Sequence, residues 1–122
     1  MIVAGVGFSS TCGAAELADL VRRAQAAAGV AATALAAPAW KADAACLANA
    51  AAALDLPILP IDRDRLAAAD TPTHSPVSRA ATGAGSAAEA CALAAVGPGA
   101  RLILPRIASA HATCALSEGD PS

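Results

Sequence analysis

Short apolar runs alternate with segments of helical periodicity along the first half of the chain, and few folds are compatible with that order. The runs span residues 1–8, 30–37 and 57–61, lengths typical of buried strands. Between them, apolar side chains recur every three or four positions, at Leu17, Leu20, Val21 and Ala24 and then at Leu47, Ala50, Ala51 and Leu54. This alternation predicts right-handed crossovers and a mainly parallel sheet with helices on its faces.

The second half predicts one more helix and a closing hairpin. Ser86-Ala87-Ala88-Glu89 has the form of a capping box, and the helix that it opens is expected to end at Gly97-Pro98. Residues 101–105 and 110–116 are expected to form two antiparallel strands. The resulting fold class is a three-layer α/β/α domain with a mixed, mainly parallel sheet of about five strands. Residues 1–116 form one domain, and residues 117–122 are expected to be a flexible tail.

The composition excludes several classes of partner. Hydrophobic residues make up 57% of the 122 residues, and much of that is alanine, so helices must approach the sheet closely. A net charge of −2 and only two aromatic residues argue against nucleic-acid binding. The uncharged stretch 24–40 is interrupted by Gly29 and Pro38, and no basic residue precedes the N-terminal apolar run. We therefore expect no membrane span, no signal peptide and a cytoplasmic location.

The four cysteines are too scattered for a metal site or a disulfide framework. They lie at positions 12, 46, 91 and 114, without a Cys-x-x-Cys pair. We expect them to be reduced core residues, and we predict neither a metal nor a cofactor. Cys12 is the exception, because it lies in a polar turn before a helix, where a thiol pKa can be lowered.

Ligand contacts are expected beyond the carboxyl ends of the strands, near the starts of helices. Three turns fall there, at residues 5–13, 38–43 and 82–86. Gly5-Val6-Gly7 could open a dinucleotide fingerprint, but Ser10 replaces the third glycine and no acidic residue closes the second strand. A tight turn and an anion-contacting turn both remain compatible with this segment.

Several polar residues in these turns have a structural interpretation beside a functional one. Lys41, the only lysine, is either a solvated side chain or an ammonium positioned for a carboxylate. Asp43 and Glu89 are interpreted as helix-capping residues, and His74 and His111 as surface or capping residues. Residues 82–86 offer backbone N–H groups to an anion but lack the Gly-Lys-Ser/Thr ending of a P-loop.

The ordered set of these segments resembles the CobE family of cobalamin biosynthesis, which is similar to the C-terminal domain of CbiG. The matching segments are Gly5-Val6-Gly7, Ser9-Ser10-Thr11-Cys12, Lys41-Ala42-Asp43, Asp62, Ser75-Pro76-Val77, Thr82-Gly83, Ser86-Ala87-Ala88-Glu89-Ala90-Cys91-Ala92-Leu93, Leu102-Ile103-Leu104-Pro105-Arg106 and Ala112-Thr113-Cys114-Ala115. The likeness runs from Ile2 to about Leu116. Arg106 stands where the family usually has lysine, which keeps the charge but not a titratable amine.

The resemblance implies binding of a methylated tetrapyrrole, a precorrin or corrin intermediate of the aerobic cobalamin pathway. The alternatives are a hydrolase that opens a ring lactone of such an intermediate, as CbiG-like proteins do, and a generic nucleotide-binding module. Other cobalamin biosynthesis enzymes are possible partners, and no catalytic residue is assigned. The expected ligand contacts are Gly7, Phe8, Ser9, Cys12, Trp40, Lys41, Thr82, Gly83, Ser86, Arg106 and Thr113.

Overall fold

The computed structural model describes residues 2–9, 11–62, 64, 87–96 and 100–119. Its elements follow the expected alternation. In chain order they are β1 (Ile2–Phe8), α1 (Ala14–Ala28), β2 (Ala34–Pro38), the 3-10 turn η1 (Ala39–Lys41), α2 (Ala45–Leu54), β3 (Ile58–Ile61), α5 (Ala87–Val96), β4 (Arg101–Ala108) and β5 (Ala112–Glu118).

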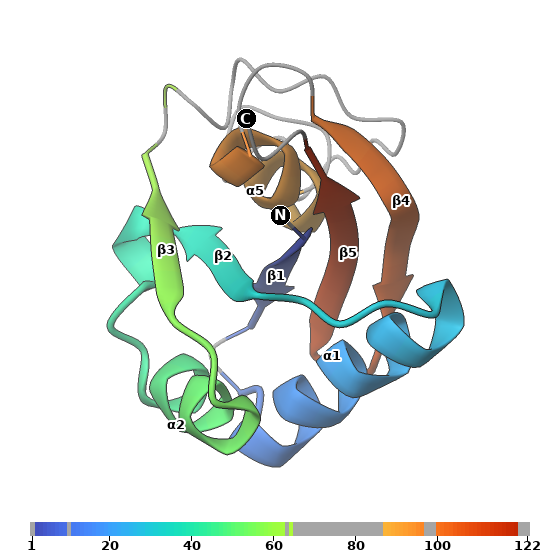
Figure 1. Cartoon of the computed structure of the whole chain (residues 1–122). Coiled ribbons are helices and arrows are strands. Elements are labelled where there is room, and N and C mark those ends of the chain that lie inside the picture. The colour runs from blue at the N-terminus through green and yellow to red at the C-terminus, as the bar shows by residue number, and fades with distance from the viewer. Residues whose placement is uncertain (1, 10, 63, 65–86, 97–99, 120–122) are drawn as a thin grey trace.

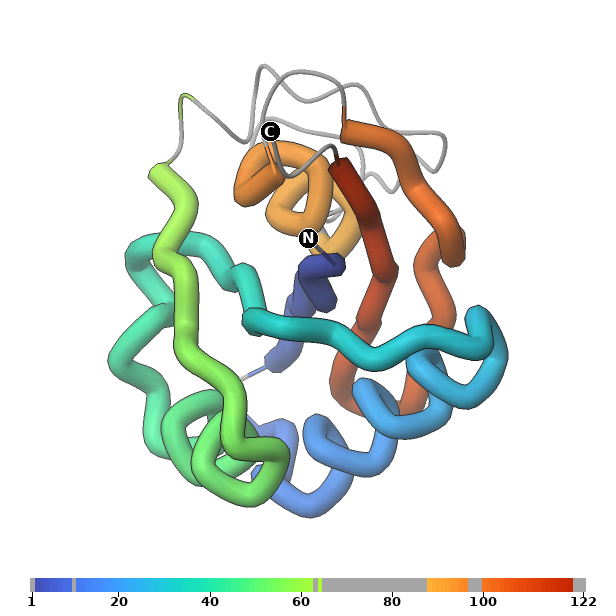
Figure 2. Tube along the Cα trace, viewed as in Figure 1, coloured from blue at the N-terminus to red at the C-terminus, as the bar shows by residue number. Residues whose placement is uncertain are grey.

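The five strands form one mixed sheet in the order β3-β2-β1-β5-β4 (Figure 1). Strands β1, β2 and β3 pair in parallel, while β5 pairs antiparallel to both β1 and β4. The path of the chain in Figure 2 shows why: long connections join the parallel strands, and a short turn joins β4 to β5. The predicted fold class and the closing hairpin are both confirmed.

Helices cover both faces of the sheet. Helices α1 and α2 pack together on one face, and α5 packs on the other across β1, β5 and β2 (Figure 1). The side chains of β1 alternate accordingly: Ala4, Val6 and Phe8 belong to the core under α1 and α2, whereas Val3 belongs to the core under α5. The α/β/α layering therefore follows from two separate cores.

The core under α5 depends on close backbone approach. A Cβ atom at Gly5 would lie 2.0 Å from the carbonyl oxygen of Ala88 and 2.5 Å from the backbone nitrogen of Ala92. Glycine in β1 and alanine in α5 are thus matched, because no larger side chain fits between strand and helix. The buried hydroxyl of Ser117 donates a hydrogen bond of 2.6 Å to the Ala92 carbonyl and ties β5 to the same helix.

Some element boundaries differ from the sequence-based predictions. Strand β2 begins at Ala34, four residues later than predicted, because Gly29 ends α1 in a left-handed conformation and the Gln25 side chain then accepts a hydrogen bond from the Ala32 N–H. The N-cap of α2 is Ala44, so Asp43 is not the capping residue.

The C-terminal strand is longer than expected. We placed its end at residue 116 and a flexible tail at 117–122, but β5 continues through Glu118, with Ser117 fully buried and opposite Val3 of β1. Pairing with β1 on one side and β4 on the other holds this segment in the sheet. Within the part of the chain that the structure describes, no helix combines the length and the apolar character needed to cross a bilayer.

Candidate functional site

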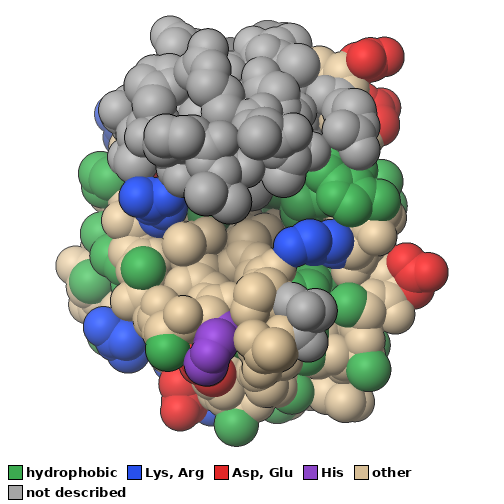
Figure 3. Space-filling model, turned by 180° about the vertical axis from the view of Figure 1, so that it is seen from behind, with side chains coloured by type: hydrophobic (Ala, Val, Ile, Leu, Met, Phe, Trp, Pro, Cys, Tyr) green, Lys and Arg blue, Asp and Glu red, His purple; other side chains and the backbone are tan. Residues whose placement is uncertain are grey.

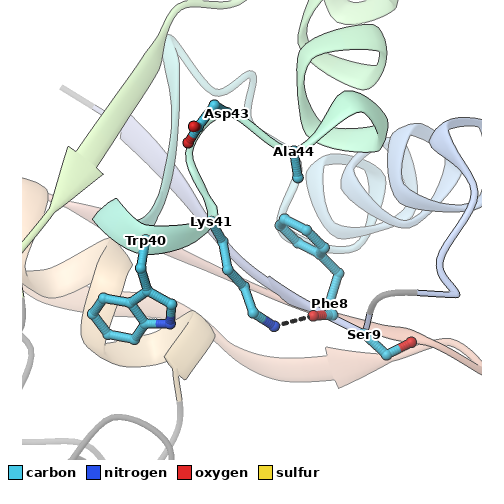
Figure 4. Close-up of a pocket in the computed structure, with 6 residues that line it drawn as sticks. All are labelled: Phe8, Ser9, Trp40, Lys41, Asp43 and Ala44. Atoms are coloured by element: carbon cyan, nitrogen blue, oxygen red, sulfur yellow. Dashed lines mark hydrogen bonds between the residues drawn. The ribbon is translucent and has the colours of Figure 1, made fainter.

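A pocket of about 440 Å³ lies beyond the carboxyl ends of β1 and β2, the parallel strands at the centre of the sheet (Figure 4). It is lined by Phe8, Ser9, Trp40, Lys41, Asp43 and Ala44. Four of these, Phe8, Ser9, Trp40 and Lys41, are among the residues that the sequence predicted to contact ligand. They come from two turns that are about thirty residues apart in the chain and that the parallel pairing of β1 with β2 brings together.

Lys41 joins the two strand ends. Its Nζ donates a hydrogen bond to the backbone carbonyl of Phe8 and lies 5.1 Å from the centroid of the Phe8 ring, within cation–π range (Figure 4). The short turn η1 holds the lysine immediately after β2. Lys41 is half-buried, and its ammonium has a partner within the protein at the pocket wall rather than extending freely into solvent.

Trp40 gives the pocket an exposed apolar wall. It is the only large hydrophobic residue in the described part of the chain that is strongly exposed, at 41%. In Figure 4 its indole ring lies on one side of Lys41 and the Phe8 ring on the other, while the carboxylate of Asp43 points away from the lysine. The pocket thus presents an aromatic surface next to a positive charge.

Gly7 and Thr113 lie beside the pocket on the face of the sheet that α5 covers. They are directly opposite each other in the β1–β5 ladder, and the Thr113 hydroxyl donates a 3.5 Å hydrogen bond to the Gly7 carbonyl. The backbone N–H of Ser9 continues the contact by donating to the His111 carbonyl at 2.9 Å. Gly7, Ser9 and Thr113 are therefore linked through the backbone at the end of β1, but Gly7 and Thr113 do not line the pocket, and the Phe8 side chain packs on the opposite face of the sheet.

Cys12 does not have the lowered pKa that we expected of a reactive thiol. The side chain is buried, and this burial raises the pKa of the Cys12 thiol, with smaller contributions from the neighbouring Glu16 carboxylate and Cys46 side chain. Burial likewise raises the pKa of the Cys91 thiol, and it raises the pKa of Cys114 to about 12. The four cysteines are free, as predicted, and Cys12 is a core residue behind the turn.

Arg106 lies on β4 at an irregularity of the sheet. Leu104 pairs with Leu116 and Ile107 with Cys114, so Pro105 and Arg106 together stand opposite the single residue Ala115. This is the pattern of a β-bulge, which redirects the residues that it contains. The bulge brings the Arg106 backbone N–H within 3.3 Å of a carboxylate oxygen of Glu89 on α5.

Glu89 makes a contact with β4 that sequence reasoning missed. We interpreted it as the second half of a capping box, yet its side chain is fully buried and contacts a strand seventeen positions later. The rest of α5 is alanine, cysteine, leucine and valine, and a glutamate in the first turn of such a helix is equally well explained by capping. The local sequence therefore carries no signal of this contact, and only the packing of α5 on the sheet reveals it.

Glu16 fastens the turn between β4 and β5 to the first turn of α1. Its carboxylate accepts hydrogen bonds from the Ser109 hydroxyl, from the His111 backbone N–H at 2.7 Å and from the His111 ring at 3.0 Å. These bonds lower the pKa of Glu16 from its ordinary 4.5 to about 2, with the bond from Ser109 as the largest cause. Figure 3 shows a histidine side chain lying directly against an acidic one. His111 lies at the surface, as expected, and its contacts with Glu16 give it a structural role.

The remaining predicted contacts, Thr82, Gly83 and Ser86, lie outside the described residues, as does His74. Basic side chains do not merge into one patch on the face seen in Figure 3; separate Lys or Arg side chains flank an area of backbone and polar groups. Among the described residues, no cluster of three or more His, Cys, Asp or Glu side chains is arranged to hold a metal ion.

These features define an open α/β domain with an aromatic and cationic pocket at the carboxyl edge of its parallel strands. Residues 2–117 match the family described as "Cobalamin synthesis G C-terminus", and the chain belongs to that family. Its role therefore lies in cobalamin biosynthesis. A search of curated proteins finds no match to the chain.

Solved structures agree with this membership. CobE, described as a protein from the cobalamin biosynthetic pathway, is 29% identical with a TM-score of 0.87, over 96% of this chain and 89% of CobE. Cobalamin biosynthesis protein chiG from Agrobacterium tumefaciens is 32% identical with a TM-score of 0.79, over 98% of this chain and 99% of that chain. A cobalamin biosynthesis protein G homologue from Sulfolobus solfataricus, 20% identical with a TM-score of 0.73, shares the fold; this chain covers 37% of its length.

Proposed function

We propose that this domain binds a precorrin or corrin intermediate of the aerobic cobalamin pathway in the pocket beyond β1 and β2. The observation that carries the proposal is the fixed ammonium of Lys41 between the aromatic rings of Phe8 and Trp40. A corrin presents a broad apolar ring surrounded by carboxylates. An exposed indole offers contact area to such a ring, and an adjacent cation offers a charge-assisted hydrogen bond to a carboxylate.

The spacing of the cations favours a large ligand over a small carboxylic acid. Lys41 follows the end of β2, and Arg106 lies on β4, with β1 and β5 between the two strands. Three strand spacings correspond to about 14 Å across the sheet. Among the described residues, the guanidinium of Arg106 takes part in none of the salt bridges. Two carboxylates on opposite sides of one macrocycle match this separation.

The overall charge works against a polyanionic ligand, so the local cations must supply the attraction. The chain carries a formal charge of −2. Two cations facing several carboxylates would give an affinity that falls as ionic strength rises, because exposed charges are screened by salt. An apolar ligand without carboxylates would show little of this dependence.

The test is a titration with dicyanocobyrinic acid, a corrin whose peripheral carboxylates are free. Trp40 is the only tryptophan and the chain has no tyrosine, so quenching of its fluorescence reports binding next to the pocket. We expect Lys41→Gln to weaken binding about tenfold, the effect of one charge-assisted hydrogen bond. Binding of dicyanocobinamide, in which those carboxylates are amides, should be weaker and the same in both proteins.

Arg22→Gln is the matched control, because Arg22 is an exposed cation on α1, outside the pocket. It should bind the acid as the unmodified protein does. If Lys41→Gln and Arg22→Gln bind equally well, the pocket is not the site. Mass spectrometry of a lactone-bearing precorrin after incubation tests the hydrolase alternative: a gain of one water would show lactone opening, whereas recovery of unchanged ligand supports binding alone.

A further inference from the structure

The buried carboxylate of Glu89 contacts the strand that carries the second cation of the proposed site. Glu89 lies in the first turn of α5 and is completely inaccessible to solvent. Burying a carboxylate is costly unless hydrogen-bond donors compensate it, so the contacts of this side chain matter for its position. One contact that it makes is the 3.3 Å hydrogen bond from the backbone N–H of Arg106.

The contact between Glu89 and Arg106 lies at the β-bulge of β4. The bulge places Pro105 and Arg106 opposite Ala115, so the regular ladder between Leu104 and Ile107 is interrupted. A bulge leaves backbone groups without their ladder partners and bends the strand. The Arg106 N–H is one such group, and Glu89 accepts its hydrogen bond from the side of the sheet that α5 covers.

We propose that Glu89 is a positioning residue for anion binding: it holds the bulge at Pro105–Arg106 against α5 and thereby directs the Arg106 guanidinium toward the ligand. This role rests on the proposed function and deepens it by naming what sets the second carboxylate contact. Glu89 itself does not touch the ligand. Among the described strands, β4 with its Arg106 lies at the edge of the sheet and pairs with β5 alone, so the contact with Glu89 supplies support on a strand that has one described partner.

The two possible effects of Glu89 on an anionic ligand have opposite signs, which makes the role testable. A buried negative charge near the site repels a polyanion, so if charge alone mattered, removing it would strengthen binding. If Glu89 positions Arg106, removing its carboxylate weakens binding despite the lost repulsion. Glu89→Gln removes the charge and keeps an oxygen acceptor, whereas Glu89→Ala removes both.

The experiment titrates dicyanocobyrinic acid into the unmodified protein and into Arg106→Ala, Glu89→Ala, Glu89→Gln and the double alanine variant, with Trp40 fluorescence as the readout. We expect Arg106→Ala to weaken binding about tenfold. Glu89→Ala should weaken it by a similar factor, and the double variant should be no weaker than Arg106→Ala alone, because the two residues act through one contact. Glu89→Gln should stay within about twofold of the unmodified protein or bind more tightly.

Amide hydrogen exchange at Arg106 measures the same contact without ligand. Protection of this amide should be high in the unmodified protein and in Glu89→Gln and should be lost in Glu89→Ala. Should Glu89→Ala fail to fold, Glu89→Asp replaces it, because the shorter side chain keeps the charge but withdraws the carboxylate from the Arg106 N–H. That variant should also weaken binding.

The titrations separate the positioning role of Glu89 from the proposed function. Additive losses in the double variant, or unchanged or tighter binding by Glu89→Ala when Arg106→Ala is weakened, would overturn the positioning role and leave the proposed function intact. Absence of binding by the unmodified protein would instead refute the proposed function itself. Non-additive losses together with lost protection of the Arg106 amide would establish Glu89 as the positioning residue.

Discussion

Gly5→Ala tests the close approach of α5 to β1. The added methyl group would meet the Ala88 carbonyl oxygen at 2.0 Å, the Ala92 backbone nitrogen at 2.5 Å and the Ala92 Cβ at 2.8 Å. Two of these atoms belong to the helix backbone, so no side-chain rotation relieves the clash. The helix must move away by about 1.5 Å to restore an ordinary nonbonded distance.

Such a displacement loosens the whole core under α5, whose buried members include Val3, Ala36, Ile61, Ala90 and Cys91. Most of these side chains are small and reach the helix only because it lies close to the sheet. A shift of the helix therefore removes contacts from all of them. We expect a loss of about 3 kcal/mol in the free energy of unfolding, at the upper end for overpacked cores. For a domain of this length that lowers Tm by about 10 °C.

Urea unfolding measures this effect, with Gly13→Ala as the matched control. Gly13 precedes α1 with a φ of −87°, and nothing lies within 4 Å of its missing Cβ. Its substitution should change stability by less than about 0.5 kcal/mol, because a weaker N-cap is offset by lower entropy of the unfolded chain. If both variants unfold at the same urea concentration, α5 does not pack this closely on β1.

Three further predictions concern the remaining contacts. Because the folded-state pKa of Glu16 is about 2, below its ordinary 4.5, the stability that it contributes is complete above pH 4.5 and is lost as the pH falls toward 2; urea unfolding of Glu16→Gln should show a flatter pH dependence in that window. Ser117→Ala removes the buried hydrogen bond to Ala92 and should cost about 1 kcal/mol in thermal unfolding, and no loss would contradict the bond. Iodoacetamide at pH 8 should modify the half-buried Cys46 well before the buried Cys12, as peptide mass spectrometry would reveal, and faster labelling of Cys12 would contradict its raised pKa.

The sequence located the pocket in outline because strand ends are readable from local patterns. Parallel neighbours place their carboxyl ends at one edge, so the turns after residues 8 and 38 had to approach each other once β1 and β2 were paired. Phe8, Ser9, Trp40 and Lys41 were found in this way. The direction of the Lys41 side chain could not be predicted in this way, because its hydrogen bond to the Phe8 carbonyl depends on the offset between the two strands.

The chain itself determined its class: apolar periodicity and turn residues define the order of strands and helices, and that order permits little besides a layered α/β sheet. Only the tertiary structure decided the roles of individual polar side chains. Glu16 and Glu89 both lie in the first turn of a helix, yet they bind residues 93 and 17 positions away. Such contacts depend on how two layers pack, and no local pattern encodes that distance.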